Sequence, residues 1–452
     1  MKTSVVRLDN IKPIQFRFDA SYHLSEGEEV KRFINASPFP LLKISDVSKD
    51  IFIGNRAKRV YVKKRTHGTP FLSSSDILQA DLDNVKIASN KYTPNIEQMK
   101  LQKGWTLISR SGTIGNCAFA NAKHAQKLAS EDVIRLVPNN ILREGLIYAY
   151  LASKYGHSLL TQGTFGAVIQ HIEPDFVGSL PIPQFPESFQ MEVDDLMQDS
   201  ARLREEATVA LEEAHKLIED QFGVGAKKKS SCVSIASIRS SHNKRFEAFY
   251  HTSENRSIYD YIIQNFEYKT LGDLTSRIFR PGIFKREYVA DGVTFLGGAD
   301  ILMQIPDSEK KLSYRQVEKM PELRVKKDWI LVTCGGTIGN TVIIDRQLEK
   351  CVVSQHVMRI VPKDNIQKGY LYAFLSSKIG YSLITMFSTG SVIPQIESHH
   401  LELVPIPIFE QKVMDYIDGL ISTYVAKMEI SKEKEILAKS IVEKEIKKWN
   451  KN

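Results

Sequence analysis

The spacing of apolar positions predicts two long helices, in Phe189 to Phe222 and in Gln411 to Trp449. The first stretch contains no Pro or Gly, and its apolar and small residues recur at alternating steps of three and four. This spacing forms a heptad seam, which favours packing against a partner helix. The seam of the first helix is Val193, Leu196, Ser200, Leu203, Ala207, Ala210, Ala214 and Leu217. The second helix has Ile417, Leu420, Tyr424, Ala438 and Ile441 in the matching places, and Lys427 and Lys434 interrupt its middle.

Shorter β-prone runs come before each predicted helix and indicate strand-rich globules. Leu41 to Val47 and Thr270 to Leu274 are predicted to be short strands. Two Gly-rich segments, residues 112–116 and 336–340, each separate a pair of β-prone runs, which predicts strand, turn, strand. Short helices packing on the sheet are predicted at Leu146 to Lys154 and Tyr370 to Lys378, and a Pro-Ile-Pro segment of extended backbone closes each globule.

The two halves repeat one another. WTLISRSGTIGN begins at Trp105, and WILVTCGGTIGN begins at Trp329, 224 residues later. The same offset carries residues 130–138 onto 354–362 and residues 180–183 onto 404–407, and no gap is needed from Trp105 to Phe185. A shared offset over this length indicates duplication, because chance similarity of Gly-rich segments would drift in register.

The fold expected from these patterns is α+β, with two similar mixed, strand-rich globules, two long helices and a pseudo-twofold internal repeat. The expected divisions of the 452 residues are the first globule at 1–186, a central helix at 187–223, a linker at 224–240, the second globule at 241–409 and a C-terminal helix at 410–452. The order is therefore globule, long helix, globule, long helix.

A basic segment differs between the two halves. In the first half Arg56, Lys58 and Arg59 precede Val60-Tyr61-Val62, and Lys63-Lys64-Arg65-Thr66-His67-Gly68 follows. In the second half Arg280, Lys285 and Arg286 precede Glu287-Tyr288-Val289, and only Ala290-Asp291-Gly292 follows. Asp-Gly between β-prone runs predicts a tight turn, so the first copy has that turn enlarged by three residues in a basic form. The segment is a candidate DNA contact, and the alternative is a charged face that only meets solvent.

The Gly-rich turns and the Gly-x-Val-Ile stretches supply the remaining candidates. The turns lack the Lys-Ser/Thr of a P-loop and the third Gly of a dinucleotide fingerprint, which favours a structural turn whose hydroxyls could still touch phosphate. The stretches at Gly166 to Ile172 and Gly390 to Ile396 are either buried strands or, at their polar residues, surface. The candidate DNA-binding residues are Arg56, Lys58, Arg59, Lys63, Lys64, Arg65, Arg110, Ser111, Thr113, Thr164, Arg280, Lys285, Arg286, Thr333, Thr337, Ser388, Thr389 and Ser391.

Composition narrows the function classes. The formal charge of +8 and the pI near 9.0 allow a polyanionic partner without requiring one. The four cysteines form no CxxC pair, and no secretory or membrane-spanning segment is apparent, so a reducing cytoplasm is expected. The sequence shows no Asn-Pro-Pro-aromatic motif, no S-adenosylmethionine loop, no nuclease triad and no metal-ligand spacing. No catalytic residue, metal or cofactor is therefore predicted.

Taken together, the chain resembles the specificity subunit of type I restriction–modification enzymes. The resemblance covers nearly the whole length. It rests on the duplicated GTIGN blocks, the Gly-x-Val-Ile stretches, the Pro-Ile-Pro segments and the two long helices. It implies two target recognition domains, each reading one part of a split DNA sequence. It also implies long spacer helices that pair antiparallel and dock methyltransferase subunits, two per chain. Catalysis would belong to those partners and to a separate motor-nuclease subunit. The first half departs from the second at Phe165-Gly166-Ala167, where the second has Thr389-Gly390-Ser391.

The helix length agrees with this role. A helix of about 30 residues is roughly 45 Å long, which is on the order of a dozen base pairs. Two globules held apart by it would bind two separated half-sites, and because their loops differ, the half-sites should differ. Two alternatives are a self-contained DNA-modifying enzyme with unrecognised motifs and a scaffold protein that binds no DNA. The first predicts activity from the chain alone with a cofactor, and the second predicts no binding to duplex DNA.

Overall fold

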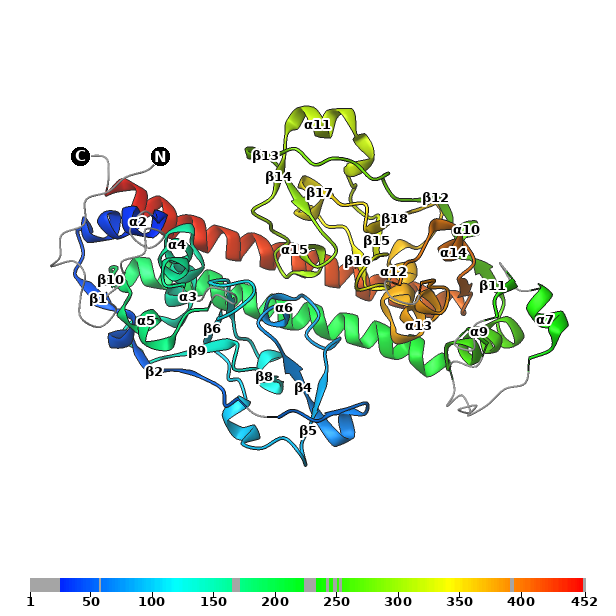
Figure 1. Ribbon diagram of the computed structural model, residues 1–452, viewed down its shortest axis with the longest axis horizontal. Helices are drawn as coiled ribbons and strands as arrows, with labels where there is room; N and C mark the ends of the chain where they lie inside the picture. Colours follow the sequence, from blue (N-terminus) through cyan, green and yellow to red (C-terminus); the bar gives the residue numbers. More distant parts are fainter. Residues whose placement is uncertain are drawn as a thin grey trace. The chain divides into compact units, whose positions relative to one another are not determined.

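The computed structural model describes residues 25–56, 58–164, 171–222, 233–240, 244–246, 250–251, 254–390 and 394–449. The chain forms two compact units (Figure 1). The first comprises Met1–Glu205 with Ile430–Asn452, and the second comprises Glu206–Glu429. Each long helix, α6 (Glu187–Gln221) and α15 (Gln411–Lys448), contributes one part to each unit. The compact units are therefore divided within the long helices and not at their ends.

The first unit is built on a four-stranded antiparallel sheet in the order β2-β9-β6-β7. Its strands are β2 (Ser48–Ile53), β9 (Val133–Pro138), β6 (Thr106–Ser109) and β7 (Cys117–Phe119). The central strands β9 and β6 are rich in β-branched and aliphatic residues and are buried on both faces along most of their length. The Gly-rich segment 112–116 connects β6 to β7, which confirms the predicted strand, turn, strand.

A second sheet of the first unit has the order β3-β5-β4-β8. Its strands are β3 (Tyr61–Val62), β5 (Ile87–Ser89), β4 (Gly68–Leu72) and β8 (Leu128–Ala129). Because β5 lies between β3 and β4, these two strands do not pair with one another, and Arg65–His67 forms a 3-10 turn between them. The predicted enlarged hairpin turn is therefore wrong. The edges of β3 and β4 that would pair with each other in a hairpin both pair with β5, which comes later in the chain.

Helices α3 (Glu144–Ala152) and α5 (Pro174–Ser179) pack on the first sheet. Helix α4 (Lys154–Gln162) packs on α3, and α2 (Glu26–Asn35) packs on α4 and β10 (Pro181–Pro183). Helix α3 is apolar all round and forms the centre of the core, which confirms the short helix predicted there. The strand expected over Leu41 to Val47 continues only through β1 (Leu41–Lys43), since Ile44–Val47 forms a 3-10 turn. Strand β1 pairs with β10 (Pro181–Pro183), the predicted extended segment.

The second unit repeats this arrangement. Its main sheet has the order β12-β18-β15-β16, and a smaller sheet has the order β14-β13-β17. The strands are β11 (Tyr268–Thr270), β12 (Thr275–Phe279), β13 (Tyr288–Leu296), β14 (Lys311–Leu312), β15 (Ile330–Thr333), β16 (Thr341–Ile343), β17 (Val352–Val353), β18 (Val357–Pro362) and β19 (Pro405–Pro407). The helices are α7 (Ile235–Ser240), α9 (Glu254–Asn265), α10 (Leu271–Leu274), α11 (Tyr314–Lys319), α12 (Lys368–Ser376), α13 (Lys378–Met386) and α14 (Ser398–Glu402).

Two predictions for the second unit are corrected. Asp291-Gly292 lies inside β13 and makes no tight turn; the pairing of β13 with β14 shifts register between Tyr288 and Val293 instead. A Cβ on Gly292 would lie 2.2 Å from the Leu312 carbonyl oxygen, so glycine is needed there for close backbone approach. The strand expected over Thr270 to Leu274 ends at Thr270, whose hydroxyl caps helix α10 by accepting from the Asp273 amide.

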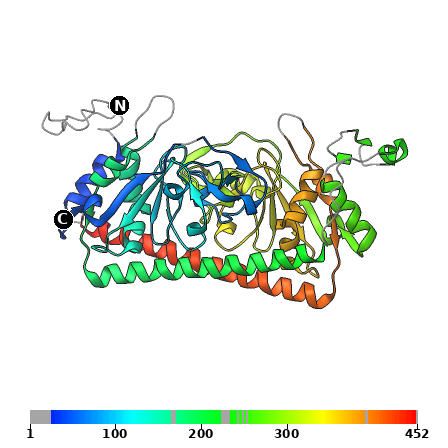
Figure 2. The ribbon, with the colours of Figure 1, turned by 90° about the horizontal axis from the view of Figure 1, so that it is seen from below.

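The long helices run antiparallel beside one another (Figure 2). In the first unit they meet at Ser200 and Ser431, where each hydroxyl donates to the other residue's carbonyl oxygen over 2.8 Å. In the second unit the Lys427 ammonium lies 2.6 Å from a Glu206 carboxylate oxygen, and the Tyr416 hydroxyl donates to Glu213 over 2.7 Å. The small side chains at the crossing allow this close approach.

The predicted seam is largely at the interior. Its buried members are Val193, Ser200, Ala207, Ala210, Ala214, Ile417 and Ala438, and its half-buried members are Leu196, Leu203, Leu217, Leu420, Tyr424 and Ile441. Met197, Arg204 and Ile218, each one position beyond a predicted leucine, are the more deeply buried residues. Lys427 and Lys434 do not interrupt the pairing, since they lie at its margin and bind Glu206 and Asp199.

Candidate nucleic-acid interface

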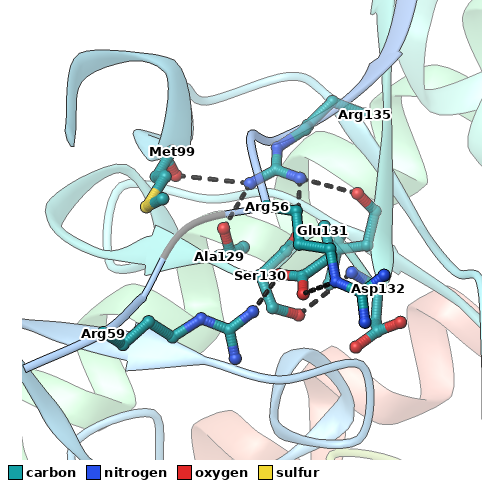
Figure 3. A network of polar contacts seen from close by, with 9 residues as sticks. Arg56, Arg59, Met99, Ala129, Ser130, Glu131, Asp132 and Arg135 are labelled. Carbon is teal, nitrogen blue, oxygen red and sulfur yellow. Dashed lines mark hydrogen bonds and ion pairs between the residues drawn. The ribbon is translucent and has the colours of Figure 1, made fainter. Parts of the chain in front are cut away.

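A buried arginine fixes the framework of each candidate site. Arg135 on β9 is fully buried, and its guanidinium donates to the carbonyl oxygens of Ser130 at 2.8 Å, Val133 at 2.6 Å and Ala129 at 2.6 Å (Figure 3). Burial lowers its pKa to about 10, so it stays charged at neutral pH. Four backbone acceptors, the fourth from Met99, take the place of a counter-ion. The loop that carries Glu131 and Asp132 is thereby held against the sheet.

Arg359 repeats this arrangement in the second unit. It lies 224 residues after Arg135 and donates to the carbonyls of Ser354 at 2.8 Å and Val357 at 2.6 Å, and to that of Val353. Burial lowers its pKa to about 10 as well. The loop at Gln355 and His356 therefore occupies the place that Glu131 and Asp132 occupy in the first unit.

The basic segment of the first unit meets that loop. Arg59 forms an ion pair with Glu131, and the Arg56 guanidinium lies 4.0 Å from the same carboxylate (Figure 3). The Arg59 guanidinium also lies 4.8 Å from the centre of the Phe71 ring on β4. Arg56 is almost fully exposed, whereas Arg59 is largely covered. Arg59 therefore ties the segment to the sheet, whereas Arg56 is only loosely paired with Glu131 and faces solvent.

The second unit has the same framework with a different lining. Arg286 lies 5.4 Å from the centre of the Phe295 ring and donates to the Gln355 side-chain oxygen over 3.4 Å. Arg286 and Phe295 border a cleft of about 340 Å³ that also includes Tyr288, Lys310, Thr337 and His356. The cleft brings together one basic segment, one Gly-rich turn and the loop held by Arg359. Cation, aromatic and hydrogen-bonding groups around an open cleft suit a nucleic acid.

The Gly-rich turns are built by their own backbone. Gly115 and Gly339 have φ of 80° and 87°, a region that favours glycine. The amide of Gly115 donates to the Ser109 carbonyl over 2.9 Å, and that of Gly339 donates to the Thr333 carbonyl over 2.8 Å. These bonds support the prediction of a structural turn. Two candidate hydroxyls take part in the turns. The Thr113 hydroxyl is hydrogen-bonded to that of Ser109 at 2.9 Å, and the Thr333 hydroxyl accepts from the Asn340 amide at 3.0 Å.

One ion pair is made by different arginines in the two units. Arg110, at the end of β6, pairs with Glu173 in the first unit. In the second unit Glu397, the equivalent of Glu173 at the offset of 224, pairs with Arg280 at 2.6 Å. Arg280 follows β12, and the equivalent of Arg110 is Cys334. Each pair joins the end of a strand in the main sheet to the glutamate that directly precedes helix α5 or α14. These two arginines therefore make a structural contact.

The other candidates lie around this framework. Lys58, Lys63, Lys64 and Lys285 are exposed, and Ser111 pairs with His171 in a backbone bridge. Arg65 pairs with Asp83 at 3.0 Å; burial opposes ionisation of Asp83, but Lys127 and Arg65 lower its pKa below the usual value. Thr164 and Ser388 are half-buried, Thr389 bonds to the Gln395 backbone, and Ser391 lies outside the described residues.

Sequence reasoning missed several residues that border the basic segments. Lys86 lies 5.1 Å from the centre of the Tyr61 ring, and Tyr92 is an exposed aromatic side chain with Lys91 beside it. Glu131 and Asp132 and their counterparts Gln355 and His356 lie in the aligned repeat but were not predicted as site residues. The sequence could have indicated them, because these positions differ in charge between the two halves while the flanking residues are the same. In the described part of the chain, no group of three His, Cys, Asp or Glu residues could hold a metal, and no helix is long and apolar enough to cross a membrane.

Comparison with known proteins places the chain in a family. The protein-family model for the type I restriction modification DNA specificity domain matches this chain twice, at residues 12–188 and at residues 263–437. A search of curated proteins gives no match. Among solved structures, the type I S subunit from M. genitalium is 14% identical, with 91% of this chain and 96% of that chain covered and a TM-score of 0.34.

The HsdS subunit from Thermoanaerobacter tengcongensis is 13% identical, with 90% of this chain and 96% of that chain covered and a TM-score of 0.29. The two matches of the family model fall on the two halves of the internal repeat and cover most of the 452 residues. The chain belongs to the family of type I restriction–modification DNA specificity subunits.

Proposed function

We propose that this chain gives a type I restriction–modification complex its DNA sequence specificity by recognising a bipartite, asymmetric target. Each unit binds one half-site, and the sequence between the half-sites is not read. The matched family is one of DNA-specificity domains and not of catalytic ones, so methylation and cleavage belong to partner subunits.

The proposal rests on one observation: the two units share the same supporting contacts, but the side chains beside those contacts differ. Arg135 and Arg359 hold equivalent loops, and Arg59 and Arg286 lie on equivalent phenylalanine rings. The side chains beside them differ: Glu131 and Asp132 in one unit correspond to Gln355 and His356 in the other. A shared scaffold with different hydrogen-bonding groups is suited to reading two different sequences, because base edges are distinguished by donors and acceptors.

The charge distribution supports a division of labour within each unit. Exposed lysines and Arg56 lie on the basic segment of the first unit, where phosphate contacts would set position without reading sequence. A net charge of +8 over the whole chain supplies only modest electrostatic attraction. We therefore propose that stable binding requires partner subunits that close around the duplex.

The long helices are the proposed docking surface for those partners. They pair with one another through one face, and their outer faces carry exposed apolar residues, among them Val209 on α6 and Ile430 and Leu437 on α15. Exposed apolar side chains on otherwise charged helices suit a protein interface. We propose that two methyltransferase subunits dock on them, one for each unit, and that a motor-nuclease subunit joins the complex through the methyltransferases.

Methylation mapping tests the proposal. The chain is co-expressed with a candidate methyltransferase partner, and the modified positions in the DNA are sequenced. The expected result is a split, asymmetric motif that appears only when both chains are present. Exchange of residues 1–186 for another recognition domain should then change one half-site and leave the other intact. Methylation by the chain alone would show a self-contained enzyme. No methylation and no duplex binding with any partner would favour a scaffold.

A further inference from the structure

Two equivalent arginines differ in whether their charge is neutralised. Arg59 and Arg286 are 227 residues apart, and each lies over the phenylalanine at the corresponding place in its unit. Arg59 is paired with the carboxylate of Glu131. Arg286 donates to the neutral amide of Gln355, and among the described residues no carboxylate oxygen lies within 4.0 Å of it. Because the second unit has Gln355 where the first has Glu131, the charge of Arg286 is not balanced by a carboxylate, whereas that of Arg59 is.

The surroundings of Arg286 leave its donors accessible. Arg286 is exposed, whereas Arg59 is largely covered. The cleft beside Arg286 contains one carboxylate, Asp300, and this group accepts the amide of Gly297 over 2.8 Å. Lys310 and His356 add further donors at the rim. The cleft therefore presents donors to a ligand that carries acceptors.

The open shape of the cleft depends on glycines. A Cβ on Gly335 would lie 2.9 Å from the His356 ring nitrogen, so a larger residue at this position would displace the His356 ring. The first unit has Ser111 at the position of Gly335, and there the shorter Asp132 takes the place of His356. It also has three serines, residues 73–75, where the second has Gly297-Gly298-Ala299. The two units have thus changed several lining residues together.

We propose that Arg286 reads a guanine in the half-site bound by the second unit, and that Arg59 is a positioning residue that reads no base. Guanine presents two acceptors, O6 and N7, to the major groove, and the guanidinium fork matches both. The Phe295 ring, whose centre lies 5.4 Å from the guanidinium carbon, limits the orientations of the fork, which a base edge requires and a phosphate contact does not. Gln355 orients the guanidinium without neutralising it. This inference rests on the proposed function, because it concerns the target that the second unit binds.

The test measures which duplexes the intact complex retains. The chain, co-purified with its methyltransferase partner, is mixed with a library of randomised duplexes, and the retained DNA is sequenced. The variant Gln355→Glu reproduces the Arg59–Glu131 pair in the second unit. The expected result is a loss of roughly 5- to 150-fold in guanine preference at one position of one half-site, with the other half-site unchanged. Arg286→Lys, which keeps the charge and removes the fork, should lose the same preference.

The matched control is Glu131→Gln in the first unit, which should release Arg59 and change only the other half-site. A split motif whose guanines survive both Gln355→Glu and Arg286→Lys would overturn the inference and leave the proposed function standing. A different result would make Arg286 a phosphate contact and also overturn the inference. In that case Gln355→Glu would lose affinity uniformly for all sequences, and Arg286→Lys, which keeps the charge, would retain it. A wild-type complex that selects no sequence would overturn the proposed function and the inference together.

Discussion

Arg204 on α6 and Glu435 on α15 form a buried ion pair, with 3.0 Å between a guanidinium nitrogen and a carboxylate oxygen. Each lies four residues beyond the serine at the helix crossing, Ser200 or Ser431. Side chains on a helix lean toward its N-terminus, so in an antiparallel pair both lean back to the crossing and meet there. The Tyr148 hydroxyl donates to Glu435 over 2.6 Å and completes the cluster. Burial would raise the pKa of Glu435, but Arg204, Lys439 and Tyr148 lower it below its usual value.

The polar cluster is a property of the first unit alone. At the offset of 224, the second unit has Met428 in place of Arg204 and Leu211 in place of Glu435. We predict that Arg204→Met alone destabilises the protein by about 3–5 kcal/mol, because Glu435 keeps a buried charge without its main partner. The double variant Arg204→Met with Glu435→Leu should recover most of that loss. Urea unfolding measures both, and equal destabilisation by the single and the double variant would contradict the prediction.

His124 makes stability depend on pH. It is fully buried, and burial lowers its pKa to about 4. Above the unfolded pKa of about 6.5 both states are neutral, and the stabilising contribution is complete. As the pH falls from about 6.5 to about 4, the unfolded chain binds a proton that the folded one does not, so about 3 kcal/mol is lost. The free energy of unfolding should fall over this range, and less steeply in His124→Gln. Equal slopes in the two proteins would exclude His124 as the source.

Two glycines of one turn allow a matched comparison. Gly339 and Gly336 have similar φ, 87° and 79°, but a Cβ on Gly339 would lie 3.0 Å from Thr385 and Tyr381, whereas a Cβ on Gly336 meets nothing within 4 Å. Both alanine variants carry the cost of left-handed backbone, about 1–2 kcal/mol. Gly339→Ala adds the steric contact and should lower the melting temperature further. A larger effect of Gly336→Ala would show that packing is not what selects glycine at position 339.

The exchanged ion pair predicts a compensating substitution. Arg280→Ile leaves Glu397 without its arginine and should destabilise the second unit by about 1–3 kcal/mol. Adding Cys334→Arg places a guanidinium where the first unit has Arg110, and the first unit has Ile53 at the position of Arg280. The double variant should therefore be more stable than Arg280→Ile alone. Thermal unfolding checks this order, and additive destabilisation by the two substitutions would contradict it.

Much of the architecture was readable from the sequence because it depends on local rules. Helical periodicity located α6 and α15 to within a few residues, and the β-prone runs on either side of the Gly-rich turns located β6, β7, β15 and β16. The repeat at one offset predicted two like units, since a duplicated sequence must bury the same positions. The GTIGN turns were predicted for the same reason, because glycine at positive φ is a local requirement.

The sequence by itself determined that two similar specificity domains are accompanied by long helices with a heptad seam. Only the tertiary structure decided which residues meet. Strand β5 arrives from later in the chain and separates β3 from β4, which no local turn signal at residues 63–68 could reveal. Arg204 meets Glu435 from 231 residues away, and Arg59 meets Glu131 from 72 residues away. The physical reason is that strand order and ion pairing depend on free energies of contacts between distant segments, and periodicity carries no information about them.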